Sequence, residues 1–144
     1  MSAHATPREV FDQLSHLIST GAWTEAADLY AEDTVVDQPF ALPAPGRTVG
    51  REQIRAHFAL AATGTLSVKA ENVVVHETTD PETVIAEYDY LGHDSATGRS
   101  FRAANIQVLT VRAGLITSSR DYHHHVALAA ATGRLPELLA ALEQ

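Results

Sequence analysis

Cysteine is absent from the 144-residue chain, and lysine occurs once, at Lys69. Without cysteine there are no disulfides, thiol nucleophiles, iron–sulfur clusters or thiolate zinc sites, and a reducing cytoplasm is a compatible location. The formal net charge is −8, from 10 Lys and Arg against 18 Asp and Glu. Phosphate backbones and anionic membranes require clustered basic residues. We therefore expect neither nucleic acid nor a membrane as a partner, and we expect a cytoplasmic location.

Long apolar runs are also absent, since no segment approaches the roughly 18 uninterrupted apolar residues of a membrane-spanning helix. The first residues lack the basic start and apolar core of a signal peptide. Apolar residues make up 45% of the chain and charged residues 19%, which is an ordinary globular balance. A chain of this length can bury its own core. We expect residues 1–144 to form a single domain.

Helical patterns dominate the first half of the chain. Thr6, Pro7 and Glu9 form a capping box that starts a helix, and Gly21 ends it. The pattern then predicts a second helix from Trp23, a strand over 33–39, a Pro/Gly loop over 41–48 and a third helix from Gly50.

From Leu66 onward the apolar residues follow the alternation of strands. The pattern predicts four strands, over 68–75, 83–91, 101–111 and 115–123, joined by short antiparallel turns, and then a helical region over 126–142. This order predicts the α+β class: a cone-shaped, strongly curved antiparallel sheet with three N-terminal helices and a C-terminal helix. Such a cone can enclose a pocket for a small ligand.

Two segments carry a resemblance to a known superfamily: YAEDTVVDQPF at 30–40 and VGREQI at 49–54. They resemble the nuclear transport factor 2-like superfamily, and within it the SnoaL-like group, which is related to ketosteroid isomerases and limonene epoxide hydrolases. The resemblance covers about residues 7–130. It implies a homodimer, a hydrophobic small molecule as ligand and chemistry without a cofactor. This fold also hosts non-catalytic binding proteins.

Three positions match functional residues of those families. SnoaL-like polyketide cyclases use an aspartate on the last strand as the base for ring closure, and Asp121 matches it. Asp37 lies in a segment similar to the one that holds the proton-shuttling aspartate of the isomerases. The isomerase oxyanion hole falls on Leu14 and Gln107, of which only Gln107 can donate a hydrogen bond. The resemblance therefore implies Asp121, Asp37 and Gln107 as catalytic candidates.

Epoxide hydrolysis is less favoured by the same comparison. Arg120, Asp121 and Tyr122 match the Arg-Asp-Tyr of limonene epoxide hydrolases, but their Arg-x-Asp falls on 88–90, which reads Tyr-Asp-Tyr. The pair of aspartates bridged by arginine is therefore incomplete.

Strand alternation indicates which side chains share the pocket with Asp121. Ser119 and His123 lie on its face of the strand, because alternate residues point to one side. Burial there would raise the pKa of Asp121 and make it a general base near neutral pH. The predicted substrate-binding residues are Trp23, Tyr30, Phe40, Tyr88, Tyr90, Asn105 and His123.

Other interpretations of these residues stay open at this point. Asp121 beside Arg120 is also typical of a surface ion pair, and Asp37 before a proline is typical of a turn. Consecutive residues of the histidine run 123–125 point to opposite faces of a strand, so we predict no metal site there. We expect an enzyme of the isomerase, cyclase or dehydratase type that acts on a hydrophobic carbonyl compound, with Asp121 as base. The alternatives are a non-catalytic small-molecule-binding or accessory dimeric domain, and a dimeric interaction module.

Overall fold

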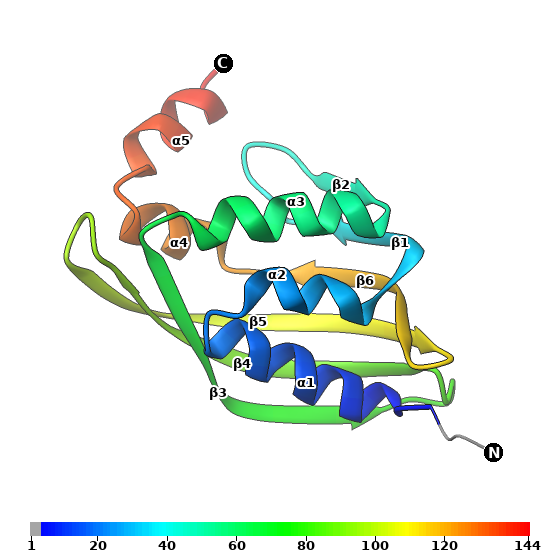
Figure 1. The fold of residues 1–144 in the computed structure, drawn as a ribbon. Helices are drawn as coiled ribbons and strands as arrows, with labels where there is room; N and C mark the ends of the chain where they lie inside the picture. Colours follow the sequence, from blue (N-terminus) through cyan, green and yellow to red (C-terminus); the bar gives the residue numbers. More distant parts are fainter. Residues whose placement is uncertain (1–3) are drawn as a thin grey trace.

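The computed structural model describes residues 4–144 and combines helices with one six-stranded sheet. Helices α1 to α3 lie on one side of the curved sheet, and α4 and α5 extend from one end (Figure 1). The elements are α1 (Pro7–Ser19), α2 (Trp23–Ala26), β1 (Tyr30–Gln38), β2 (Gly46–Val49), α3 (Arg51–Ala62), β3 (Leu66–Glu77), β4 (Thr83–Asp94), β5 (Arg99–Arg112), β6 (Leu115–Tyr122), α4 (His125–Ala131) and α5 (Leu135–Leu142). This arrangement confirms the predicted α+β class. No helix within residues 4–144 combines the length and the apolar character needed to cross a membrane.

The sheet has the order β2-β1-β6-β5-β4-β3 and does not close into a barrel. Strands β3 to β6 form the predicted antiparallel meander. Strand β1 joins β6 in parallel, with Val36 opposite Ser119, so the sheet is mixed rather than wholly antiparallel. Strand β2 lies where a loop was predicted, because Gly46–Val49 pairs with the end of β1. Tyr30 starts β1, where it pairs with Ile116 of β6.

Helix α1 begins as the sequence predicts. The Thr6 hydroxyl accepts a hydrogen bond from the Glu9 backbone N–H (3.2 Å), and the Glu9 carboxylate accepts one from the Thr6 N–H (3.1 Å). This reciprocal cap satisfies two backbone donors that a helix start otherwise leaves without partners. Val10, Phe11 and Leu14 form the buried face of the helix. These three side chains belong to the core and fix α1 over the sheet.

Strand register decides which polar side chains enter the interior. On β5, Asn105 and Gln107 are buried in alternation with exposed neighbours, as predicted. On β6, Ser119 and Asp121 are buried on the predicted face. Ile116 is also fully buried, although alternation predicts that it faces outward. A register shift between β5 and β6 near Ile116 reverses the alternation at that point.

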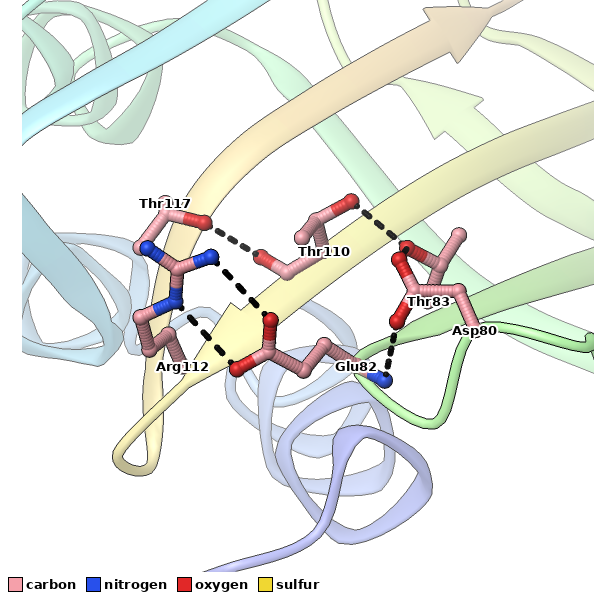
Figure 2. Close-up of polar contacts among 6 residues, drawn as sticks. All are labelled: Asp80, Glu82, Thr83, Thr110, Arg112 and Thr117. Carbon is pink, nitrogen blue, oxygen red and sulfur yellow. Dashed lines mark hydrogen bonds and ion pairs between the residues drawn. The ribbon is translucent and has the colours of Figure 1, made fainter.

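One ion pair and several hydrogen bonds hold the β3–β4 turn against β5 (Figure 2). Arg112 makes two hydrogen bonds of 3.2 Å to the Glu82 carboxylate. The hydroxyls of Thr83 and Thr110 lie 3.0 Å apart across β4 and β5. The Asp80 carboxylate accepts the Glu82 backbone N–H at 2.9 Å, which shapes the turn. These contacts fix the end of the hairpin.

Candidate active site

A cavity of about 140 Å³ lies between the helices and the inner face of the sheet. Apolar side chains of α1 and α3 form one part of its wall: Phe11, Leu14, Ile18 and Phe58. The sheet contributes a second part, which carries most of the polar groups: Tyr30, Gln38, Tyr88, Tyr90, Gln107, Asp121 and His123. The cavity therefore combines an apolar wall with one carboxylate, as small-molecule sites do.

Asp121 is buried in this wall, with 9% of its surface exposed. The Ser119 hydroxyl donates a hydrogen bond of 2.5 Å to its Oδ1. Burial raises the pKa of Asp121 to about 6, while hydrogen bonds from Ser119 and Gln107 act in the opposite direction. The carboxylate is therefore ionised at neutral pH but much more basic than an exposed aspartate. Such a group can take a proton from a weak carbon acid and return it.

A chain of hydrogen bonds behind Asp121 runs in one direction. The Tyr88 hydroxyl donates to Gln107 Oε1 (3.1 Å), and Gln107 Nε2 donates to Ser119 Oγ (3.0 Å). Ser119 then donates to Asp121. Gln107 is directly opposite Asp121 in the β5–β6 register, and this pairing brings the two side chains together. Gln107 also acts as a hydrogen-bond donor to the Asp121 carboxylate, which lowers the pKa of that group. Gln107 therefore orients the carboxylate, and its amide hydrogens are directed to Ser119 and Asp121 rather than to a substrate oxyanion.

His123 lies beside the second oxygen of the carboxylate, with Nε2 at 3.9 Å from Asp121 Oδ2. The Asn105 amide nitrogen donates to the Ala103 carbonyl (3.3 Å), so its oxygen accepts from His123 Nδ1, 2.8 Å away. The His123 ring stacks on Tyr90, with centroids 6.0 Å apart. Burial lowers the pKa of His123 to about 4. The imidazole is therefore neutral at pH 7, and its unprotonated Nε2 faces Asp121.

Tyr30 and Tyr90 bring hydroxyl groups to the same cavity. The pKa of Tyr30 is raised well above its ordinary value, first by burial and then by the negative charge of Asp121. Burial raises the pKa of Tyr90 to about 12. Both phenols therefore keep their protons at neutral pH. Within residues 4–144 the Tyr30 hydroxyl has no protein hydrogen-bond partner, which leaves it available to a ligand.

Comparison with known proteins places this geometry in a family. Residues 11–119 match the model of the SnoaL-like domain. This chain belongs to the SnoaL-like family. An uncharacterised PhzA/B-like protein of Pseudomonas aeruginosa is 31% identical over 116 residues, which cover 80% of this chain and 82% of that protein.

Solved structures confirm the fold of this SnoaL-like domain. An isomerase candidate from Bacillus subtilis superimposes with a TM-score of 0.82 at 25% identity, over 89% of this chain and 93% of that chain. A polyketide cyclase candidate from Pseudomonas putida gives 0.76 at 15% identity, over 89% of this chain and 98% of that chain. The fold is that of the nuclear transport factor 2-like and ketosteroid isomerase-like proteins.

Asp37 does not reach the cavity of the SnoaL-like domain, contrary to the expected second catalytic position. Its carboxylate accepts a hydrogen bond of 2.7 Å from Arg47 Nε on the neighbouring strand β2. Val36 is buried in the core, so alternation turns Asp37 outward and Gln38 toward the cavity. Gln38 lines the cavity and was not predicted, as is also true of the wall residues Phe11, Ser15, Ile18 and Phe58. The sequence signal for Gln38 is strand alternation from the apolar Val36, two residues earlier, which the structure buries.

Trp23 and Phe40 were predicted to bind substrate, and neither lines the cavity. Trp23 Nε1 donates to the Ile18 carbonyl (2.9 Å), so the indole joins α2 to the end of α1. Phe40 lies beyond the end of β1, is 66% exposed and packs edge-on against Tyr122. Of the other predicted positions, Tyr30, Tyr88, Tyr90 and His123 line the cavity. Asn105 is buried and supports His123.

The three histidines of the run 123–125 do not converge on one point, because they lie at the junction between strand β6 and helix α4. His124 caps helix α4, where its Nδ1 accepts the Ala127 backbone N–H at 3.1 Å. The His125 ring contacts the edge of His123, with centroids 6.0 Å apart. No group of three or more acidic or histidine side chains within residues 4–144 is arranged to hold a metal ion.

Proposed function

We propose that this SnoaL-like domain is an enzyme that removes a proton next to the carbonyl group of a hydrophobic small molecule. The observation that supports the proposal is the buried Asp121, whose pKa of about 6 suits a general base near neutral pH. Isomerisation, cyclisation and dehydration of carbonyl compounds all begin with such a proton transfer. The names of the two structural neighbours, an isomerase candidate and a polyketide cyclase candidate, fit this class of reaction.

The two oxygens of Asp121 have different roles in this proposal. Oδ1 accepts the short hydrogen bond from Ser119. Oδ2 lies near the unprotonated Nε2 of His123, which offers it no hydrogen. Oδ2 is therefore the basic atom that takes the proton from the substrate. The hydroxyl of Tyr30, whose pKa is raised partly by the charge of Asp121, donates a hydrogen bond to the substrate oxygen as it becomes an enolate.

Exchange of carbon-bound hydrogen tests the proposal without knowledge of the natural substrate. A panel of cyclic ketones in D₂O, together with the isomerisation of 3-cyclohexenone, reports abstraction of the α proton by NMR. Asp121→Asn should lower the rate by at least about 100-fold, the usual contribution of a general base. Asp37→Asn is the matched control, because Asp37 pairs with Arg47 outside the cavity, and it should leave the rate unchanged. Full exchange in Asp121→Asn would overturn the proposal.

A non-catalytic ligand-binding domain is the second candidate function. It is favoured by the engagement of Gln107 with Tyr88 and Ser119 and by Leu14 at the position of the isomerase tyrosine. These features leave the oxyanion hole of the steroid isomerases incomplete. Binding of ketones without exchange in D₂O would identify this function. The homodimer and the cytoplasmic location also stay predictions, and sedimentation equilibrium tests the former.

A further inference from the structure

We infer that the cavity takes uncharged carbonyl compounds of about one ring and discriminates against both carboxylate-bearing and multi-ring compounds. The choice of carbonyl compounds as the ligand class rests on the proposed function. The limits on charge and size rest on the cavity itself, through its volume, the side chains that form its wall and their protonation states.

The volume of the cavity limits how much of a ligand it can enclose. At about 140 Å³ it is close to an engineered protein cavity of about 150 Å³ that binds benzene. It is well below the roughly 300–1,000 Å³ of pockets that hold drug-sized ligands. Phe11 and Leu14 form part of the wall and are buried in the core. Since cores are close-packed, these side chains do not move aside at low cost.

The charges of the wall exclude anionic ligands. Among the residues that line the cavity there is no lysine or arginine. His123 is neutral at pH 7, because burial lowers its pKa to about 4. Asp121 is thus the charged group that a ligand meets, and its charge is negative. A ligand carboxylate would lose its hydration, find no cation and be repelled by Asp121.

The remaining polar groups of the wall suit a neutral oxygen. Within residues 4–144, neither the Tyr30 hydroxyl nor the Gln38 side-chain amide has a hydrogen-bond partner in the protein. Both can donate to a carbonyl oxygen. The rings of Tyr30 and Phe58 meet edge to face, with centroids 6.0 Å apart, and Phe11 and Tyr88 are tilted by 53°. These rings line the space around the donors with apolar surface that a single ring can fill.

Binding measurements on the wild-type protein at pH 7.5 test the charge and the size separately. For charge, 4-oxocyclohexanecarboxamide is compared with 4-oxocyclohexanecarboxylate, which has the same shape. For size, cyclohexanone is compared with 2-decalone, which adds a second ring. Calorimetry or ligand-observed NMR should give a Kd at least tenfold lower for the first member of each pair. Equal affinity within either pair would overturn that part of the inference.

Two variants test whether the named side chains cause the discrimination. In Asp121→Asn, the Kd of the carboxylate should come within threefold of the Kd of the carboxamide, while cyclohexanone still binds. Phe58→Leu should strengthen 2-decalone binding at least fivefold. Leu60→Ala is its matched control, because Leu60 lies on the same helix and is 74% exposed. An unchanged carboxylate-to-carboxamide ratio in Asp121→Asn would contradict the role assigned to the charge.

The failure of the inference can be told apart from the failure of the proposed function. Selective binding of cyclohexanone without exchange of its α hydrogens supports the ligand class and contradicts the base assigned to Asp121. Exchange that proceeds equally well with the carboxylate or with 2-decalone supports the base and overturns the ligand class.

Discussion

Ser119 Oγ lies 2.5 Å from Asp121 Oδ1 and donates its hydrogen to that oxygen. This bond stabilises the ionised carboxylate and so opposes the effect of burial on its pKa. It also holds Oδ1 against the protein, while Oδ2 lies on the side of His123 Nε2. Ser119 is therefore expected to act on the reaction through Asp121, without contact with the substrate.

Replacing Ser119 with alanine should raise the pKa of Asp121 above about 6. More of the carboxylate is then protonated at neutral pH, so the acidic limb of the kcat/KM profile moves to higher pH. The pH dependence of α-proton exchange measures this shift. Ser118→Ala is the matched control, because Ser118 is the neighbouring serine of β6 and alternation turns it to the opposite face from Ser119 and Asp121. An acidic limb that stays in place in Ser119→Ala would contradict the role assigned to this hydroxyl.

Asp121→Asn should stabilise the protein at pH 7.5. The folded state raises the pKa of Asp121 from an ordinary 3.8 to about 6, so the folded state holds this proton more tightly than the unfolded state does. The contribution of Asp121 to stability therefore falls as the pH rises from about 4 to about 6. The full difference corresponds to about 3 kcal/mol. Thermal unfolding should give a higher Tm for Asp121→Asn than for the wild type at pH 7.5, and the gain should shrink at pH 4.

In the variant His123→Gln, the loss of stability that Asp121 causes as the pH rises should become visible in the free energy of unfolding. Burial lowers the pKa of His123 from 6.5 to about 4, so the contribution of His123 to stability rises as the pH increases from about 4 to 6.5. That trend opposes the trend from Asp121 over nearly the same range. Without His123 the free energy of unfolding should fall between pH 4 and pH 6, as measured by urea titration. A rise over that range in the variant would show that the two groups do not compensate.

Tyr30→Phe should separate donation to the substrate from simple packing. The variant keeps the ring that packs on Phe58 and removes the hydroxyl. Loss of an oxyanion donor typically lowers kcat by about 10²–10³. We expect a decrease of this size in α-proton exchange, with little change in the free energy of unfolding. Trp23→Phe is a useful comparison, because Trp23 joins α1 and α2 away from the cavity wall, and it should leave kcat unchanged.

The parts of the fold that depend on local chemistry could be predicted from the sequence. Thr6 and Glu9 lie three residues apart and cap α1 through their own backbone groups. Alternation along β5 and β6 correctly placed Gln107 and Asp121 on one face, because both strands keep a regular register in this region. These positions need no knowledge of the rest of the chain.

The failures occur where a distant segment decides the local structure. Gly46–Val49 becomes a strand because β1 is available as a partner, and nothing within those four residues requires it. Asp37 and Gln38 are adjacent, and only the buried Val36 shows which of them faces inward. Phe40 follows the end of β1, where alternation no longer applies, so its aromatic character gave no information about its position.

The parallel pairing of β1 with β6 has a consequence for the order of folding. Tyr30 pairs with Ile116, which lies more than half the chain away, and pairings between distant segments form slowly because a long loop must close first. The meander of β3, β4 and β5 can form from neighbours, but β1 can take its place only after β6 has been made. Tyr30 and Gln38 then meet Asp121 in a late step. A growing polypeptide therefore cannot bind a ligand in this cavity until β6 (Leu115–Tyr122) has been synthesised.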